Sequence, residues 1–184
     1  MCENLILCLL LPVLLSCGGI PEERTNIPAD SVQIGYSCTD TSIVVPQGSI
    51  QTGNTDPAKL IAYSKTLKGI PYKYASTDPE AGFDCSGFIT YVFNHFGIEV
   101  PRASVDFTDK GTPVDLALSK PGDLILFTGT DSTIRTVGHM GIITQTGDSI
   151  VFIHSTSGKA YGVTETTLNP YYMGRFMKII RVFE

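Results

Sequence analysis

Residues 82–93 read GFDCSGFITYVF and set a cysteine between an acidic residue and a serine, at the start of a predicted helix. At about 100° per residue the following apolar positions share one arc of a helical wheel. They are Phe88, Ile89, Tyr91, Val92, Phe93 and Phe96, and Gly97 ends the helix. Cys85 falls on the same arc, so we expect its thiol to face whatever the helix packs on, with Ser86 at the edge of the arc.

A second helix is predicted at residues 57–68, before this stretch. Asp56 suits the N-cap, Pro57 the first helical position and Gly69 the left-handed stop. A short helix is also predicted at residues 104–110, where Gly111 ends it.

The period of the sequence changes after Pro121. Short β-branched and aromatic runs, separated by turn residues, occupy 123–128, 139–145, 149–155, 161–166 and 176–183. Helices first and strands afterwards predict an α+β domain, with N-terminal helices packed on a mostly antiparallel sheet of five to six strands.

Two histidines lie on neighbouring runs joined by the sequence QTGD. A two-residue loop at Thr146 and Gly147 would pair Gln145 with Asp148 and place His139 directly opposite His154. Their Cβ atoms would then be about 5 Å apart on one face of the sheet. A three-residue bulged loop would shift this register.

The face that carries both histidines also carries apolar positions, at Gly141, Ile143, Ile150 and Phe152. We therefore expect this face to meet the helix that begins at Cys85. The third histidine, His95, lies ten residues beyond Cys85. That separation is about 15 Å along a helix, so His95 is predicted to be a partly buried structural residue.

One thiol and two facing imidazoles predict an activated nucleophile. We assign Cys85 as the nucleophile, His139 as base and then acid, and His154 as the group that orients His139. A helix N-terminus and a nearby imidazolium are expected to lower the pKa of Cys85 from about 8.5. Spacing alone does not decide which histidine plays which part.

Several motifs resemble the NlpC-type cell-wall cysteine peptidases, a papain-like family that cuts peptidoglycan stem peptides. They are GIPYKYASTDPEAGFDCSGFITYVFNHFGIEVPRAS, KPGDLILF, GHMGI and IHS, in family order, in a match from about Asp56 to the C-terminus. The resemblance implies hydrolysis of the bond between D-γ-glutamate and the diamino acid, through a thioester on Cys85. His139 would be the base and His154 would take the third position.

The resemblance also implies that Tyr72, Asp84, Ser86 and Arg102 shape the substrate site. Taken alone, Tyr72 could be a core aromatic, Asp84 and Ser86 helix-capping groups, and Arg102 a surface charge or a loop clamp. The sequence YAS at 74–76 stands where many relatives have an aromatic residue and two glycines. The insertion TGTDSTIRTV before His139 is a candidate specificity loop.

Composition limits the remaining classes of function. The 184 residues are 42% apolar, which suits one domain with a core and a tail. The net charge is −5 and Lys and Arg do not cluster, so we expect no nucleic acid partner. We expect a monomer without a cofactor or a metal ion.

The N-terminus predicts export. Residues 1–16 contain an apolar run that is too short to span a bilayer and suits a signal peptide, although MCEN opens with an acid instead of a base. LLSCG resembles a lipobox, which would make Cys17 the lipidated first mature residue; ordinary cleavage beside an incidental cysteine is the alternative. Residues 17–55 would be tether and approach segment, and residues 56–184 the peptidase domain, outside the cytoplasm in a bacterial envelope.

Other interpretations stay open at this point. Cys38 and Cys85 could form a disulfide in an exported domain, which would remove the nucleophile. One cysteine and two histidines could instead hold zinc. The chain could also be a catalytically silent wall-binding lipoprotein, or could transfer the acyl group to an amine.

Overall fold

The computed structural model describes residues 48–184. The predicted signal peptide, Cys17, Cys38 and most of the approach segment lie outside the described residues. Within that range Ile50 is buried in the core and the Thr52 hydroxyl donates to the carbonyl of Val182 at 3.3 Å. No helix in residues 48–184 has both the length and the apolar character needed to cross a membrane.

Both main helices begin and end near the predicted residues. Helix α1 spans Pro57–Thr66, and the Asp56 side chain accepts a hydrogen bond from the backbone N–H of Ala58. Helix α2 spans Cys85–His95 and has Asp84 as its N-cap. The predicted helix at 104–110 is a shorter 3-10 turn, η1 (Ser104–Phe107).

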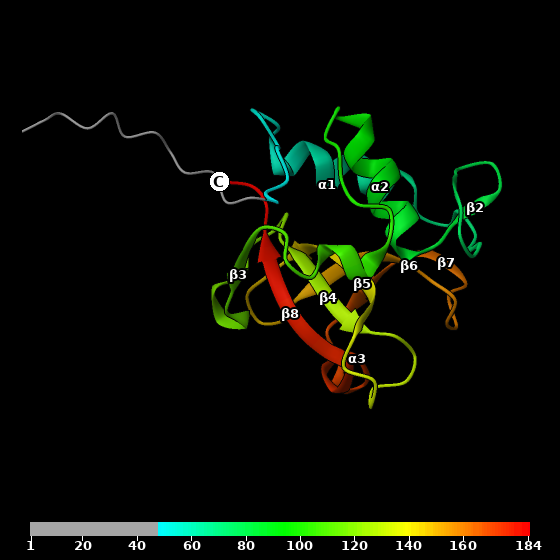
Figure 1. Ribbon diagram of the computed structural model, residues 1–184. Coiled ribbons are helices and arrows are strands. Elements are labelled where there is room, and N and C mark those ends of the chain that lie inside the picture. The colour runs from blue at the N-terminus through cyan, green and yellow to red at the C-terminus, as the bar shows by residue number, and fades with distance from the viewer. Residues whose placement is uncertain (1–47) are drawn as a thin grey trace, which may run out of the picture. The chain divides into compact units, whose positions relative to one another are not determined.

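A six-stranded sheet in the order β3-β8-β4-β5-β6-β7 forms the centre of the domain, and its neighbouring strands are antiparallel (Figure 1). Its strands are β3 (Thr112–Val114), β4 (Leu124–Thr128), β5 (Val137–Gln145), β6 (Val151–Thr156), β7 (Gly162–Thr167) and β8 (Phe176–Arg181). The α+β class and the antiparallel sheet are confirmed.

Five short elements were not predicted. They are strand β3 and, in addition, β1 (Thr77–Asp78), β2 (Gly82–Phe83), η2 (Leu116–Leu118) and α3 (Pro170–Arg175). Helix α3 is capped by Asn169, whose side chain accepts from the N–H of Tyr172. It matters most for the site, because it covers part of the sheet that α1 and α2 leave open.

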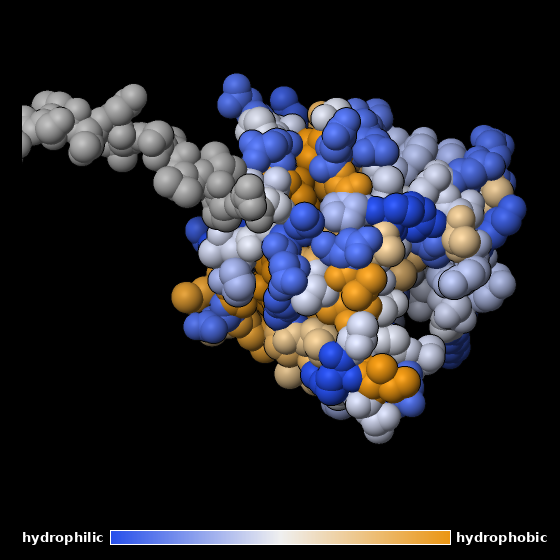
Figure 2. Space-filling view, in the orientation of Figure 1, coloured by the Kyte–Doolittle hydropathy of each residue, from blue (hydrophilic) through white to orange (hydrophobic). Residues whose placement is uncertain are grey.

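The two faces of the sheet belong to separate apolar clusters. Helices α1 and α2 pack on one face, together with sheet residues such as Met140, Ile142 and Ile153. The other cluster contains Phe127, Ile143, Phe152 and Ile179 from the sheet and Tyr172 from α3. Figure 1 shows α1 and α2 above the sheet and α3 below it. On the outer surface hydrophilic residues cover much of the visible face, with several separate apolar groups among them (Figure 2).

Candidate active site

Cys85 occupies the first position of helix α2, and the segment before it is fixed by close contacts. The Asp84 carboxylate accepts a hydrogen bond from the N–H of Gly87 at 2.6 Å, and the Asp84 N–H donates to the carbonyl of Ser76 at 3.1 Å. A Cβ atom at Gly87 would collide with that Ser76 carbonyl. Glycine is therefore needed two residues after Cys85, because backbone passes where a side chain would lie.

The two histidines predicted for the site, His139 and His154, are in direct contact. His139 Nε2 lies 2.8 Å from His154 Nδ1, and both residues are buried. His154 Nε2 lies 2.9 Å from the hydroxyl of Thr166 on β7. The nitrogen of His139 that this chain of contacts leaves for another partner is Nδ1.

The predicted hairpin register was wrong, although the face was right. Ile142 pairs with Ile153 and Ile143 with Phe152, so His154 is shifted by two residues and lies opposite Gly141 instead of His139. The connection is longer than two residues because Ile150 packs into the cluster below the sheet and β6 begins only at Val151. A shift of two residues keeps each side chain on its face, so the imidazoles meet as diagonal neighbours.

Gly141 makes room for that diagonal contact. A Cβ atom there would lie 2.8 Å from the Ile153 carbonyl oxygen and 3.2 Å from the Cβ of His154. Both distances are shorter than ordinary van der Waals contact. The absence of a side chain at Gly141 therefore lets His154 lean across β5 toward His139.

The prediction that the histidine face meets helix α2 was wrong. Helix α2 packs on the face of Met140 and Ile142, whereas His139 and His154 pack against Phe127, Phe152 and Tyr172 below the sheet. Tyr172 stacks on His139 with ring centroids 6.2 Å apart. Both faces of β5 are apolar, so alternation along the strand could not tell which one the helix covers.

Cys85 approaches the histidine side of the sheet near the start of strand β5. Its sulfur lies 3.9 Å from the carbonyl oxygen of Gly138, the residue before His139. The register between β4 and β5 shifts at Phe127 and Thr128, beside this point, and such bulges commonly redirect side chains near active sites. The hydroxyl of Ser155, next to His154, donates to the carbonyl of Phe83 at 2.7 Å and ties β6 to the segment before Asp84.

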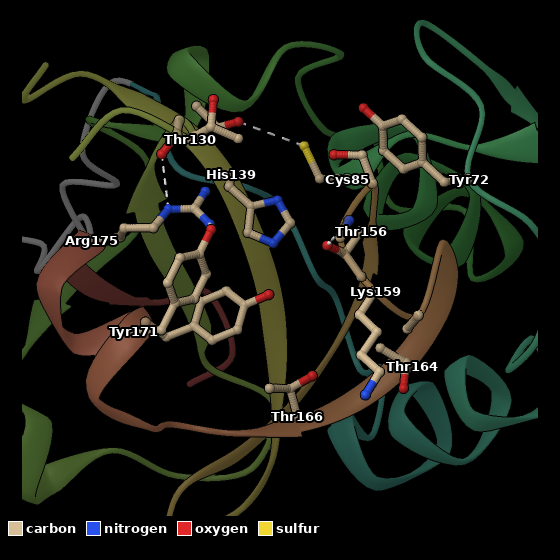
Figure 3. A pocket seen from close by; sticks show the side chains of 16 residues that line it. Tyr72, Cys85, Thr130, His139, Thr156, Lys159, Thr164, Thr166, Tyr171 and Arg175 are labelled. Atoms are coloured by element: carbon tan, nitrogen blue, oxygen red, sulfur yellow. Dashed lines mark hydrogen bonds between the residues drawn. The ribbon is translucent and has the colours of Figure 1, made fainter.

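Cys85 and His139 line one cavity of about 1010 Å³ (Figure 3). Its wall comes from the start of α2, the loop after β4, the turn between β6 and β7, and helix α3. The lining residues are Tyr72, Cys85, Gly129, Thr130, Gly138, His139, Thr156, Ser157, Gly158, Lys159, Ala160, Thr164, Thr166, Tyr171, Tyr172 and Arg175. Gly129 and Thr130 belong to the predicted specificity loop, so part of that loop does border the cavity.

Thiol and imidazole are both driven toward their neutral forms. Burial, and next the Asp84 carboxylate, raise the pKa of Cys85, against the backbone N–H groups of Ser86 and Cys85. Burial, the neighbouring His154 and then the Arg175 guanidinium hold the pKa of His139 well below its usual value. The expected lowering of the Cys85 pKa was therefore wrong for the free protein, because desolvation outweighs the helix N-terminus.

The other predicted site residues divide into two groups. Tyr72 lines the cavity with Cys85 and His139. Asp84, Ser86 and Arg102 instead bond to each other: Arg102 Nη2 donates to Asp84 Oδ2 at 2.6 Å, and Arg102 Nη1 donates to Asp84 Oδ1 at 3.0 Å and to Ser86 Oγ at 3.1 Å. This clamp holds the N-terminus of α2 and lies outside the cavity lining.

Three residues near the histidines were not predicted from the sequence. Thr166 contacts His154, Tyr172 packs on both imidazoles, and Arg175 lines the cavity. The spacing of Thr164 and Thr166 in the predicted strand was a usable signal, because residues two apart share a face. Asn169 and Pro170 likewise form a helix-start signal for α3.

Two alternatives can be compared with this geometry. In residues 48–184 no three His, Cys, Asp or Glu side chains cluster in a way that suits a metal ion. The two imidazoles direct facing nitrogens at each other, which does not favour the zinc interpretation. His95 is exposed and not partly buried as predicted, and it stacks on Tyr63 with ring centroids 3.6 Å apart, away from Cys85.

Comparison with known proteins gives consistent matches. Residues 69–181 match the NlpC/P60 family. The chain is 30% identical over 139 residues to the gamma-DL-glutamyl hydrolase of Bacillus subtilis, covering 76% of this chain and 33% of that protein. It is 32% identical over 173 residues to the murein DD-endopeptidase MepS/murein LD-carboxypeptidase of Escherichia coli, covering 92% and 87% of the two chains.

Solved structures share the fold. An NlpC/P60 family protein from Bacillus cereus superposes with a TM-score of 0.63 at 31% identity, over 71% of this chain and 41% of that one. This chain spans about a third of the length of the Bacillus subtilis hydrolase it matches. The match therefore concerns only part of that larger protein.

Proposed function

Because the chain belongs to the NlpC/P60 family, we propose that it is a cell-wall cysteine endopeptidase that hydrolyses peptidoglycan stem peptides between D-γ-glutamate and the diamino acid. The observation that carries the proposal is one cavity lined by a helix-start thiol and by an imidazole hydrogen-bonded to a second imidazole. Relatives named as a gamma-DL-glutamyl hydrolase and as DL-endopeptidases support the bond.

In the proposed reaction Cys85 Sγ attacks the carbonyl carbon while His139 Nδ1 removes the thiol proton. A thiol and a neutral imidazole as the resting pair suit this concerted transfer, in which the base is free to accept. The tetrahedral intermediate then expels the amine of the diamino acid, which takes the proton from His139. Water attacks the resulting thioester with His139 as base, and the glutamyl carboxylate and the thiol are released.

His154 is proposed to orient His139. For Nδ1 of His139 to accept a proton, its Nε2–H must donate to His154 Nδ1, and His154 Nε2–H must then donate to Thr166. The reverse arrangement would leave a proton on Nδ1 and disable the base. We therefore assign Thr166 as a positioning residue that favours the productive tautomer.

On the acyl side we propose Tyr72, Asp84, Ser86 and Arg102 as substrate-binding residues. Tyr72 borders the cavity beside Cys85. The Asp84–Arg102 pair is half exposed on its arginine side, where a ligand could reach it. The N-terminal lipid on Cys17 would hold a monomeric enzyme in the cell envelope, with its catalytic domain outside the cytoplasm.

A second candidate activity is the one in the name of the Escherichia coli relative, a DD-endopeptidase. The reason to retain it is length, because this chain covers 87% of that protein and only a third of the Bacillus subtilis hydrolase. The same thiol chemistry would serve either bond.

Digestion of defined muropeptides by the full-length chain, followed by mass spectrometry, tests both candidates. We expect fragments cut after D-γ-glutamate from the wild type, none from Cys85→Ala, loss of activity on alkylation and retained activity with chelator. Fragments cut at a cross-link between two D-centres would select the DD-endopeptidase instead. Equal activity of wild type and Cys85→Ala would refute a cysteine peptidase.

A further inference from the structure

The cavity carries positive charge without a compensating carboxylate. Its titratable lining comprises Cys85, His139, three tyrosines and two cationic side chains, Lys159 and Arg175, and no Asp or Glu of the described residues lines it. The whole chain, in contrast, has a net charge of −5. Positive charge concentrated in one hollow of an acidic protein favours an anionic ligand there.

Arg175 is an unusual member of that lining. It is only 7% exposed, and its three bonds go to uncharged oxygens: Nε donates to the Gly129 carbonyl at 2.8 Å, Nη2 to the Thr128 carbonyl at 2.9 Å and Nη1 to the Tyr171 hydroxyl at 2.9 Å. Its guanidinium carbon also lies 5.2 Å and 5.6 Å from the ring centres of Tyr171 and Tyr172.

These contacts fix the guanidinium but leave it incompletely satisfied. A guanidinium has five N–H donors, so two remain after these three bonds, one on each terminal nitrogen. Among residues 48–184 no carboxylate forms an ion pair with Arg175. A buried charge without a counter-ion is unfavourable, and a carboxylate from a ligand would relieve it with charge-assisted hydrogen bonds.

The position of His139 shows which part of a substrate would occupy this end of the cavity. In the proposed reaction His139 gives its proton to the leaving amine, so that amine must lie within hydrogen-bond reach of the imidazole. Tyr172 contacts both the His139 ring and the Arg175 guanidinium, so the arginine lies one aromatic ring beyond the imidazole. Figure 3 shows Arg175 and Lys159 on the cavity wall around His139.

We propose that Arg175 is the carboxylate-binding residue for the leaving half of the substrate, with Lys159 as the outer cation of the same site. The inference rests on the proposed function for the direction in which the substrate lies. The carboxylate has two possible sources: the side chain of a diamino-dicarboxylic acid, or the free main-chain carboxylate of a C-terminal leaving residue. A diamino acid with neither carboxylate would bind weakly.

Binding to the full-length Cys85→Ala chain tests the proposal without catalysis. The ligands are peptides L-alanyl-γ-D-glutamyl-X, in which X is diaminopimelic acid or lysine, each with a free or an amidated main-chain carboxyl group. We expect the lysine amide to bind roughly 10- to 100-fold more weakly than the peptides that carry the recognised carboxylate. A preference that follows the side chain identifies the dicarboxylic acid, and one that follows the main chain identifies the C-terminal carboxylate.

Variants in the same Cys85→Ala background assign the preference to a residue. Arg175→Gln should reduce it to within about threefold, and Arg175→Lys should restore part of it, because charge returns without the fixed fork. Arg135→Gln is the matched control: Arg135 donates to the Phe176 carbonyl at 2.7 Å, from the loop that Arg175 also holds, but does not line the cavity. Its preference should match that of the parent chain.

Three results would overturn the proposal: equal binding of all four peptides, an unchanged preference in Arg175→Gln, or a preference lost only in Lys159→Gln. The four-peptide comparison in the parent chain needs no arginine variant, so equal binding would overturn the proposal even if Arg175→Gln fails to fold. An Arg175-dependent preference in a chain whose wild type cleaves none of the peptides would refute cleavage after D-γ-glutamate and leave the carboxylate site standing.

Discussion

Two arginines near Cys85 lie in opposite electrostatic settings. Arg102 is half exposed and makes a bidentate ion pair with Asp84, so its charge is neutralised within the protein. Arg175 is buried, bonds only to uncharged oxygens and faces the cavity. Arg102 therefore stabilises the fold around the N-terminus of α2. Arg175 is instead held in a fixed position, and its charge remains available to an anionic ligand.

The largest stability effect should come from Asp84. Asp84→Ala removes the N-cap of α2 and leaves Arg102 and the Gly87 N–H without their partner. A lost cap costs about 1 kcal/mol and a lost charge-assisted bond about 1.5–3 kcal/mol. After allowance for the exposure of Arg102, we expect the free energy of unfolding to fall by about 2–3 kcal/mol in denaturant titrations.

Arg175→Gln should lower the free energy of unfolding less than Asp84→Ala, because it removes a charge that no carboxylate in residues 48–184 pairs with, whereas Asp84→Ala leaves the Arg102 charge without its partner. An equal or greater loss in Arg175→Gln would mean that both arginines are mainly structural, and the contrast between them would disappear.

The next largest effect should be on the pH dependence of kcat/KM, which we expect to differ between variants of Arg175 and Arg102. His139 must be neutral to act as base, so activity rises as pH increases through its pKa. Burial, His154 and Arg175 lower that pKa, and Arg102 is not among the causes. Arg175→Gln should therefore move the acid limb to higher pH, while Arg102→Gln leaves the limb in place; the reverse pattern would contradict the assignment of His139 as base.

A remote ion-pair network provides the smallest expected effect. Burial alone would raise the pKa of Glu165, but hydrogen bonds from Lys68, Lys65 and Thr144 lower it to about 2. The pairs therefore stabilise the fold above the unfolded pKa of about 4.5, and this contribution is lost as pH falls through 2.

Partly exposed pairs of this kind contribute little. Glu165→Gln should lower the free energy of unfolding by about 1 kcal/mol at pH 7 and by less at pH 2. A loss that does not shrink on acidification would indicate packing as its cause.

The sequence predicted the chemistry of the site better than its location on the sheet. Cys85 at a helix start and the shared face of His139 and His154 could be predicted because helix caps and strand alternation are local signals. The prediction that the two histidines share a face was correct although the predicted β5–β6 register was wrong, because a shift of two residues keeps each side chain on the same face.

Other features depend on tertiary packing. Met140 and Ile142 are as apolar as Ile143 and Phe152, so the strand could not indicate which face α2 covers. Arg175 ends a six-residue helix that is too short to show a period, and the lack of a carboxylate partner for it within residues 48–184 is visible only in three dimensions. The raised pKa of Cys85 likewise results from burial, which a motif does not report.

The most direct test of the account is cleavage of L-alanyl-γ-D-glutamyl-diaminopimelic acid by the full-length chain in water enriched in oxygen-18. We predict that the wild type releases diaminopimelic acid and places one heavy oxygen in each new glutamyl carboxylate, as hydrolysis of a Cys85 thioester requires. Cys85→Ala should form no product. Product formed by Cys85→Ala at the wild-type rate would contradict the account.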